Sequence, residues 1–87
     1  MPTKKPAWYV YILECADNSL YTGITIDLER RLNEHNHDNK LAAKYTRVRR
    51  PLKLVYKEKT VSRAVAAKRE YEIKKLKKSE KLAMINI

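Results

Sequence analysis

Two stretches of β-branched and aromatic residues lie near the start of the chain, separated by a short polar segment. They cover residues 8–13 and 20–25, and the segment between them, residues 16–19, has the composition of a turn. This pattern predicts a β-hairpin. A third apolar stretch at residues 52–56 follows Pro51 and predicts another strand.

Apolar residues with helical spacing follow the hairpin. Asp27 offers a side chain that can cap a helix, and Leu28 and Leu32 form an apolar pair four residues apart. The pattern therefore predicts a helix that runs to about His35, before a polar cluster at residues 36–39 stops it.

Three further helices are predicted in the rest of the chain. Ser62 is placed to cap a long helix that runs to about Leu76, a short helix is expected at residues 41–45, and Ser79 is expected to cap a last short helix. Strands and helices together predict an α/β protein of the α+β kind, with a small three-stranded antiparallel sheet flanked by helices.

The length of 87 residues allows one small domain. We expect residues 1–6, with two prolines and two lysines, to form a flexible tail, residues 7–83 to form the domain, and residues 84–87 to form the C-terminal end. No stretch has the roughly 18 consecutive apolar residues of a membrane span. We therefore expect a cytoplasmic protein without a membrane partner.

Basic residues are concentrated in the second half of the chain. The formal net charge is +10, and the 17 residues from Lys40 to Tyr56 contain six basic side chains and no acidic one. Uncompensated lysine and arginine side chains bind phosphates by releasing counterions. A charge run can also be an ordinary solvated surface. The acid-free stretch favours nucleic acid as the first partner to consider.

Tyrosine and glycine are used unusually. The chain has six tyrosines, no phenylalanine and a single glycine, Gly23, which lies inside the second predicted strand. Glycine weakens a strand, so its presence there usually marks a bulge or a close backbone approach by another group. Gly23 therefore indicates a site next to Tyr21.

Strand geometry sets a condition on this site. Side chains alternate between the two faces of a strand. Tyr11 and Tyr21 therefore share a face only if the numbers of any two residues that pair across the hairpin add up to an even number. A two-residue turn at Asp17 and Asn18 would put the two tyrosines on opposite faces. We therefore predict an odd-length loop or a bulge in the hairpin.

The order of these motifs resembles the GIY-YIG nuclease family. Tyr9-Val10-Tyr11 is followed by Tyr21-Thr22-Gly23 and by a predicted helix with Arg31 and His35. The resemblance runs from Trp8 to about Leu82. It is closest to a small stand-alone bacterial group, whose Arg-Leu-x-x-His-Asn and Lys-Tyr-Thr-Arg segments are similar to residues 31–36 and 44–47.

The resemblance implies a set of catalytic residues. These are Tyr11, Tyr21, Arg31 and His35, with Gly23 as a structural residue of the site. It also implies one divalent metal ion, Mg²⁺ or Mn²⁺, bound by a glutamate early in the last long helix. Glu70 matches that position best on resemblance, while helical spacing alone does not separate it from Glu72.

The chemistry of phosphodiester hydrolysis agrees with these residue types. Arg31 and His35 lie four residues apart, on one face of the predicted helix, so both can reach one phosphate. Arg31 supplies charged donors to the phosphoryl oxygens, and a metal held by Glu70 acts as Lewis acid. Tyr11 is the candidate general base, with His35 lowering its pKa or taking its proton, and Tyr21 is expected to position the phosphate.

Two functions follow as hypotheses. The first is a metal-dependent DNA endonuclease that selects branched, flapped or single-stranded DNA by shape. The second is a non-catalytic nucleic-acid-binding module on the same scaffold, with RNA as a further partner; a protein partner is unknown. In both, binding is expected from basic and aromatic residues outside the catalytic set: Lys44, Tyr45, Arg47, Arg49, Arg50 and Lys74.

Overall fold

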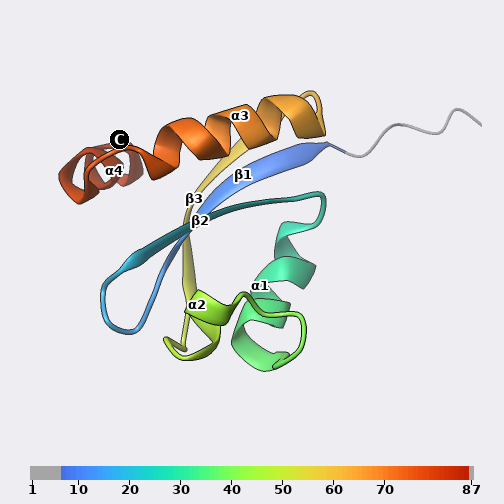
Figure 1. The fold of residues 1–87 in the computed structure, drawn as a ribbon, viewed down its shortest axis with the longest axis vertical. Helices are drawn as coiled ribbons and strands as arrows, with labels where there is room; N and C mark the ends of the chain where they lie inside the picture. Colours follow the sequence, from blue (N-terminus) through green and yellow to red (C-terminus); the bar gives the residue numbers. More distant parts are fainter. Residues whose placement is uncertain (1–6, 87) are drawn as a thin grey trace, which may run out of the picture.

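A computed structural model describes residues 7–86, so the tail expected at residues 1–6 lies outside the described part of the chain. Three strands and four helices follow one another along these residues (Figure 1). They are β1 (Trp8–Glu14), β2 (Leu20–Thr25), α1 (Leu28–His37), α2 (Lys44–Arg47), β3 (Lys53–Thr60), α3 (Arg63–Lys74) and α4 (Lys78–Ile85).

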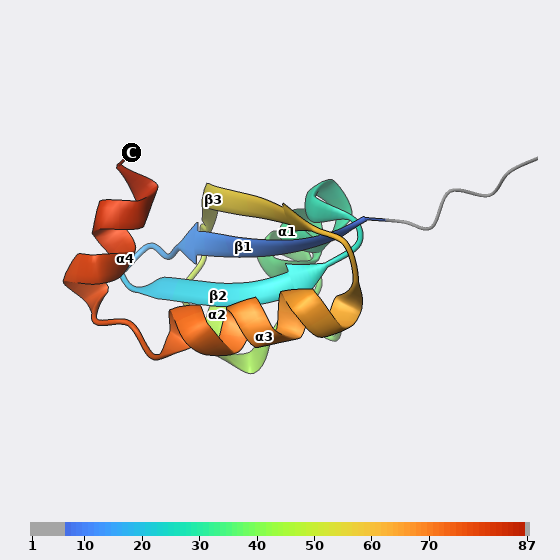
Figure 2. The same ribbon diagram turned by 90° about the horizontal axis from the view of Figure 1, so that it is seen from above.

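The sheet has the strand order β2-β1-β3, and both pairs of neighbours are antiparallel. Helix α3 covers one face of the sheet, while α1 and α2 lie on the other (Figures 1 and 2). The expected α+β fold with a three-stranded antiparallel sheet is therefore confirmed. No helix within residues 7–86 is long and apolar enough to cross a membrane.

The central strand β1 supplies side chains to two separate cores. Val10 and Ile12 pack against Ala66 and Ile73 of α3 on one face. Tyr11 lies on the opposite face, in the cluster that also contains Leu13 and Leu52. Residues 10–13 are at most 2% exposed, because helices cover both faces of this strand.

The hairpin meets the geometric condition set by the two tyrosines. Glu14 pairs with Leu20, so five residues form the connecting loop, and Tyr11 lies opposite Gly23. The predicted odd loop length is confirmed. Tyr11 and Tyr21 consequently share the sheet face that α1 covers.

Some element boundaries differ from those predicted. Strand β3 extends to Thr60, because residues 57–60 pair with the first residues of β1; the charged residues of this edge strand obscured the strand pattern. Helix α2 begins at Lys44 rather than at residue 41. The expected cap at Ser79 was wrong: Lys77 caps α4, because the Glu80 side chain accepts a hydrogen bond of 2.9 Å from the Lys77 backbone N–H.

Gly23 is required by the close approach of a side chain. A Cβ atom at this position would lie 2.5 Å from the Oη atom and 2.7 Å from the Cζ atom of Tyr11, well inside van der Waals contact. Tyr11 is 2% exposed and has little room to move. The sole glycine of the chain therefore makes room for the Tyr11 phenol.

We expect the Gly23→Ala substitution to lower the free energy of unfolding by about 1–3 kcal/mol, the usual cost of overpacking a core. Urea unfolding measures this cost. In a Tyr11→Leu background, where the phenol is absent, the same substitution should cost clearly less. An equal cost in both backgrounds would contradict the steric explanation.

Candidate active site

Four of the residues identified from the sequence meet on the α1 face of the sheet. The Tyr11 hydroxyl lies 2.9 Å from the Nε2 atom of His35, and the rings of Tyr21 and His35 have their centroids 5.2 Å apart. Arg31 lies one turn before His35 on α1, which Asp27 begins by accepting a hydrogen bond from the Arg30 backbone N–H. The hairpin and α1 thus bring these side chains together.

The Tyr11 hydroxyl is protonated at neutral pH. Burial, together with the neighbouring Tyr21 hydroxyl and the Glu70 carboxylate, raises the pKa of Tyr11 to about 12, although the Arg31 guanidinium beside it acts in the opposite direction. The proton of Tyr11 is therefore available for donation to His35.

Burial also controls the charge of His35, whose side chain is fully inaccessible to solvent. Burial and then the positive charge of Arg31 lower the pKa of His35 to about 4, with Glu34 opposing the shift. The imidazole is consequently neutral at neutral pH, so one ring nitrogen donates a hydrogen bond and the other accepts one.

Thr46 of α2 decides which nitrogen carries the proton. Its Oγ1 atom donates to the carbonyl oxygen of Ala43 at 2.9 Å and lies 2.7 Å from the Nδ1 atom of His35. Since the single hydroxyl proton is used on Ala43, Thr46 must accept from Nδ1–H. The Nε2 atom is then the acceptor, and the Tyr11 hydroxyl donates to it. A directed chain of hydrogen bonds runs from Tyr11 to Ala43.

Sequence analysis missed this role of Thr46. The residue belongs to the Lys-Tyr-Thr-Arg segment that was noted only for its resemblance, and nothing in its local pattern links it to His35, eleven positions earlier. Thr46 is fully buried, although its polar neighbours Lys44 and Arg47 are typical of an exposed segment.

Arg31 is anchored beside the cluster and remains partly accessible. One of its guanidinium nitrogens, Nη1, donates to the Glu34 carboxylate at 3.0 Å and to the Leu41 carbonyl oxygen at 2.6 Å. Its side chain is 25% exposed. These contacts hold the guanidinium next to the Tyr11 hydroxyl while leaving part of it open to an anion.

The structure separates the two glutamates of α3. The Glu70 carboxylate lies close enough to Tyr11 to affect its pKa, and its side chain is 24% exposed. Glu72 pairs with Arg69, which is itself bound to Glu58 of β3, on the far side of β1 from β2. Of the two glutamates, Glu70 is the one whose charge acts on the Tyr11 hydroxyl.

A single carboxylate is compatible with a hard divalent cation. Within residues 7–86, no three His, Cys, Asp or Glu side chains form a group that could hold a metal by themselves. Mg²⁺ commonly binds one or two carboxylates and fills its remaining positions with water and substrate phosphate. Glu70, which is paired with Lys74 at 3.6 Å and whose charge acts on the pKa of Tyr11, is a carboxylate of this kind.

Tyr45 and Arg49, both predicted to bind nucleic acid, contact one another. The Tyr45 ring stacks on Tyr21 with centroids 6.1 Å apart, and the Arg49 guanidinium lies 3.8 Å from the Tyr45 centroid. Arg49 also forms an ion pair of 3.1 Å with Asp17 of the hairpin loop. Tyr45 nevertheless remains 39% exposed, so part of its side chain is open to a ligand.

The other predicted binding residues differ in their surroundings. Arg50 donates to the carbonyl oxygens of His35 and Asp38 and to the Asn39 side chain, so it joins the end of α1 to the segment before β3. Arg47 donates to the Asn39 carbonyl oxygen. Lys44 is exposed, and Lys74 is paired with Glu70.

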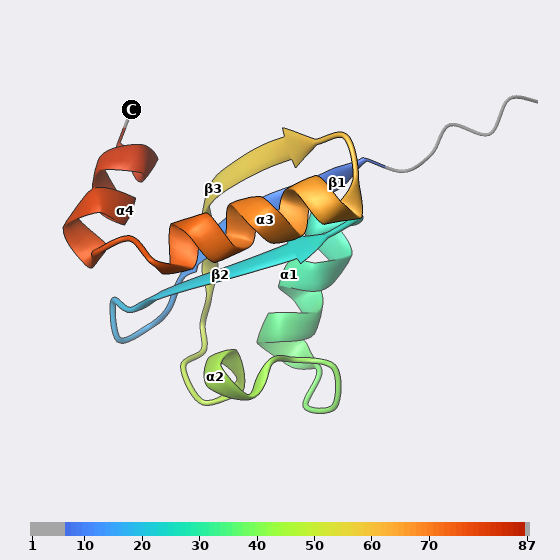
Figure 3. The ribbon, with the colours of Figure 1, turned by 45° about the horizontal axis from the view of Figure 1, so that its top comes forward.

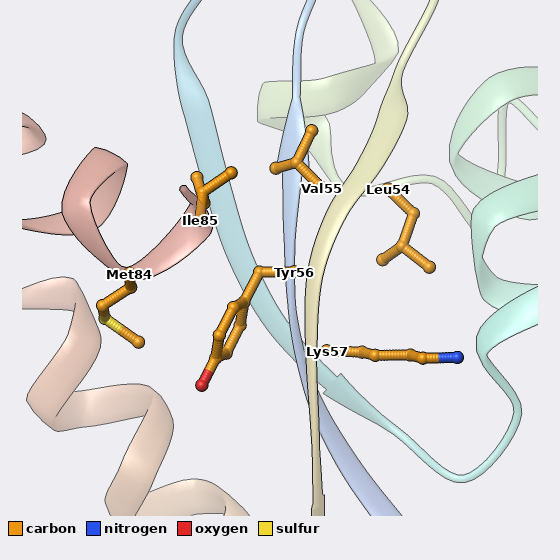
Figure 4. Close-up of a pocket in the computed structure, with 6 residues that line it drawn as sticks. All are labelled: Leu54, Val55, Tyr56, Lys57, Met84 and Ile85. Atoms are coloured by element: carbon orange, nitrogen blue, oxygen red, sulfur yellow. The ribbon is translucent and has the colours of Figure 1, made fainter. Parts of the chain in front are cut away.

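The largest of the three described hollows lies away from this cluster. It has a volume of about 540 Å³ and is located between β3 and α4, where Tyr56, Met84 and Ile85 are among its lining residues (Figure 4). The Tyr56 hydroxyl is already bound to Glu58. None of the residues identified from the sequence lines this hollow, so it is not the candidate reaction centre.

We expect Thr46→Val to change the tautomer of His35. The variant keeps the shape of the side chain but cannot accept from Nδ1–H, so the ring proton should move to Nε2. Nitrogen-15 chemical shifts of the His35 ring measure this directly. Thr46→Ser, which keeps the hydroxyl, is the matched control; wild-type ring shifts in the valine variant would refute the assignment.

The free energy of unfolding should fall as pH drops from about 6.5, the ordinary histidine value, to about 4, because the unfolded chain then binds a proton that folded His35 excludes. The maximal loss is about 3 kcal/mol. Urea unfolding across this range measures it. His35→Gln should lack this part of the pH dependence, whereas the exposed His37→Gln on the same helix should retain it.

Comparison with known proteins identifies the family of the chain. Residues 7–83 match the GIY-YIG catalytic domain. A UPF0213 protein of Desulfotalea psychrophila is 52% identical over 83 residues, covering 95% of this chain and 74% of that protein. A UPF0213 protein of Syntrophus aciditrophicus is 54% identical over 77 residues, covering 88% and 87%.

Solved structures show the same fold. The solution structure of the UPF0213 protein BH0048 of Bacillus halodurans is 42% identical with a TM-score of 0.58, covering 92% of this chain and 83% of that one. The solution structure of EF2693 of E. faecalis is 40% identical with a TM-score of 0.63, covering 99% and 88%. The chain therefore belongs to the GIY-YIG family, together with small bacterial UPF0213 proteins.

Proposed function

We propose that this protein is a metal-dependent DNA endonuclease that hydrolyses phosphodiester bonds at the cluster of Tyr11, Tyr21, Arg31, His35 and Glu70. GIY-YIG domains are in general nuclease domains that act on nucleic acid with a divalent metal. The observation that carries the proposal is the directed hydrogen-bond chain from Tyr11 through His35 to Thr46, set beside the Arg31 guanidinium.

The proton of the attacking water leaves through Tyr11. As the water oxygen forms its bond to phosphorus, the Tyr11 oxygen takes the water proton and passes its own proton to the Nε2 atom of His35. The bond from phosphorus to the leaving deoxyribose oxygen breaks in the same displacement, and that oxygen takes up a proton from solvent, to which His35 later returns its extra proton. Tyr11 never needs to become a stable phenolate, which its pKa of about 12 would disfavour.

A bound substrate supports this transfer electrostatically. Arg31 lowers the pKa of His35 in the structure without substrate. A phosphodiester anion held by the same guanidinium offsets that positive charge and so favours protonation of His35. Arg31 also stabilises the charge that develops on the phosphoryl oxygens, and Tyr21, beside the His35 ring, positions the phosphate.

Glu70 is the side chain that would hold the metal. A bound Mg²⁺ or Mn²⁺ ion would supply Lewis-acid stabilisation of the phosphate and of the leaving oxygen. Lys74, paired with Glu70 at 3.6 Å, would release the carboxylate when the cation binds. The released lysine would then be available to a phosphate of the same strand.

The substrate is proposed to be branched, flapped or single-stranded DNA, with RNA as a further candidate and the cytoplasm as the location. The net charge of +10 supports a polyanionic partner. Tyr45, which stacks on Tyr21 and contacts Arg49, and the exposed Lys44 offer contacts to the backbone and the bases. Selection by strand geometry suits a surface that presents charged and aromatic side chains.

Cleavage of end-labelled single-stranded, flapped and branched DNA tests the proposal. We expect cutting with Mg²⁺ or Mn²⁺ and none with EDTA. Tyr11→Phe and Glu70→Gln should each lower the cleavage rate by at least about 100-fold, the usual contribution of a general base or a metal contact. Glu72→Gln makes the same charge change two residues along α3 and should retain near wild-type activity.

Other outcomes identify the alternative. Salt-sensitive binding without cutting in every variant would show that the chain is a nucleic-acid-binding module and not a nuclease. Equal losses in Glu70→Gln and Glu72→Gln would remove the assignment of Glu70 as the metal ligand.

A further inference from the structure

A second hollow adjoins the cluster at the open edge of the sheet. It has a volume of about 440 Å³ and lies between α1 and the beginning of α3, at the end of the edge strand β2. Figure 3 shows how α1 and α3 flank this strand. Trp8, Ile24 and Ile26 provide its apolar lining, and Arg30, Arg31 and Arg63 provide its positive charge.

The charges of this hollow are incompletely balanced. Arg30 and Arg31 share one carboxylate, that of Glu34, at 3.6 and 3.0 Å. Arg63 forms none of the ion pairs found among residues 7–86, and its guanidinium lies 5.8 Å from the centre of the Trp8 ring. Three guanidinium groups against one lining carboxylate make the hollow attractive to an anion.

The hollow combines guanidinium groups with an indole ring, and this combination limits the kinds of anion that fit it. A small inorganic anion would use the guanidinium groups and gain nothing from Trp8 or from Ile26, which is 39% exposed. A nucleotide carries a phosphate for the arginines and an apolar base or sugar face for the indole. Arg63 and Trp8 lie together, so a ligand that binds one also touches the other.

The position of Arg31 connects this hollow to the reaction centre. Arg31 lines the hollow and also lies beside the Tyr11 hydroxyl. We propose that the hollow binds the nucleotide next to the scissile phosphate, with its phosphate on Arg63 and its base or sugar against Trp8. This subsite rests on the proposed function, because it places the substrate strand along the edge of β2.

The single tryptophan of the chain makes the subsite directly observable. Wild-type protein in EDTA, which prevents metal-dependent cutting, is titrated with single-stranded DNA while Trp8 emission is followed. Binding is measured independently by the fluorescence anisotropy of an end-labelled oligonucleotide. We expect the oligonucleotide to change Trp8 emission with the same dissociation constant that anisotropy gives, and dAMP to bind at least 100-fold more weakly than the oligonucleotide.

Arg63→Gln tests the phosphate contact. Loss of one charge-assisted hydrogen bond should weaken binding by about tenfold and should reduce the slope of log K against log salt by about one. Lys68→Gln is the matched control, because it removes an equal charge from an exposed position of α3 that does not line the hollow. It should bind as wild type does.

The outcomes separate the subsite from the nuclease. Binding by anisotropy with unchanged Trp8 emission, or with equal affinities in Arg63→Gln and Lys68→Gln, would overturn the subsite and leave the nuclease intact. Equal affinity for dAMP and the oligonucleotide would overturn it in favour of a free-nucleotide site. The expected emission change, together with no cleavage when Mg²⁺ or Mn²⁺ is added, would support nucleotide binding in the hollow but overturn its placement next to a scissile phosphate together with the nuclease. No binding of the oligonucleotide would overturn the subsite, while the cleavage assay decides the nuclease separately.

Discussion

The approach of the Tyr11 phenol to the backbone of Gly23 is the constraint on which the rest of the site depends. It places a large polar side chain in a nearly inaccessible position on the central strand. A buried hydroxyl needs a partner, and His35 supplies it. His35 is in turn buried and needs its own partner, which Thr46 provides from a different helix. The absence of a Cβ atom at Gly23 thus makes room for the hydrogen bonds that join β1, α1 and α2.

Burial gives this chain its chemical character. Exposed to water, the same phenol and imidazole would titrate near their ordinary values and would exchange hydrogen bonds with solvent. Inside the protein the pKa of Tyr11 rises and that of His35 falls, so the proton they share stays on the Tyr11 oxygen. The arginine beside them is held by a carbonyl oxygen and a carboxylate, which keeps a positive charge at the edge of a dry site.

Sequence patterns predicted the fold, and the resemblance to a known family named the residues of the cluster. Two β-branched and aromatic runs with turn residues between them located the hairpin, and the requirement that Tyr11 and Tyr21 share a face predicted the odd loop. Helical spacing placed Arg31 and His35 on one face of α1. These signals are local, or follow from the pairing of neighbouring strands, and such patterns can be read along a chain.

Contacts between distant segments could not be predicted in this way. The role of Thr46 depends on where α2 packs, and the separation of Glu70 from Glu72 depends on how α3 crosses the sheet. The subsite proposed at Trp8 and Arg63 combines two residues that lie more than fifty positions apart in the sequence. The wrong prediction at Ser79 has a local cause. The neighbouring Glu80 side chain accepts a hydrogen bond from the Lys77 backbone N–H, so the helix begins after Lys77.

The length of the five-residue hairpin loop restricts how this loop can change in evolution. Surface loops ordinarily tolerate insertions and deletions of any length. Here a change of one residue, if the strands re-paired around it, would turn Tyr21 to the other face of the sheet and away from His35. Chains that keep this site are therefore free to vary the loop in steps of two residues, whereas single-residue changes need a compensating bulge.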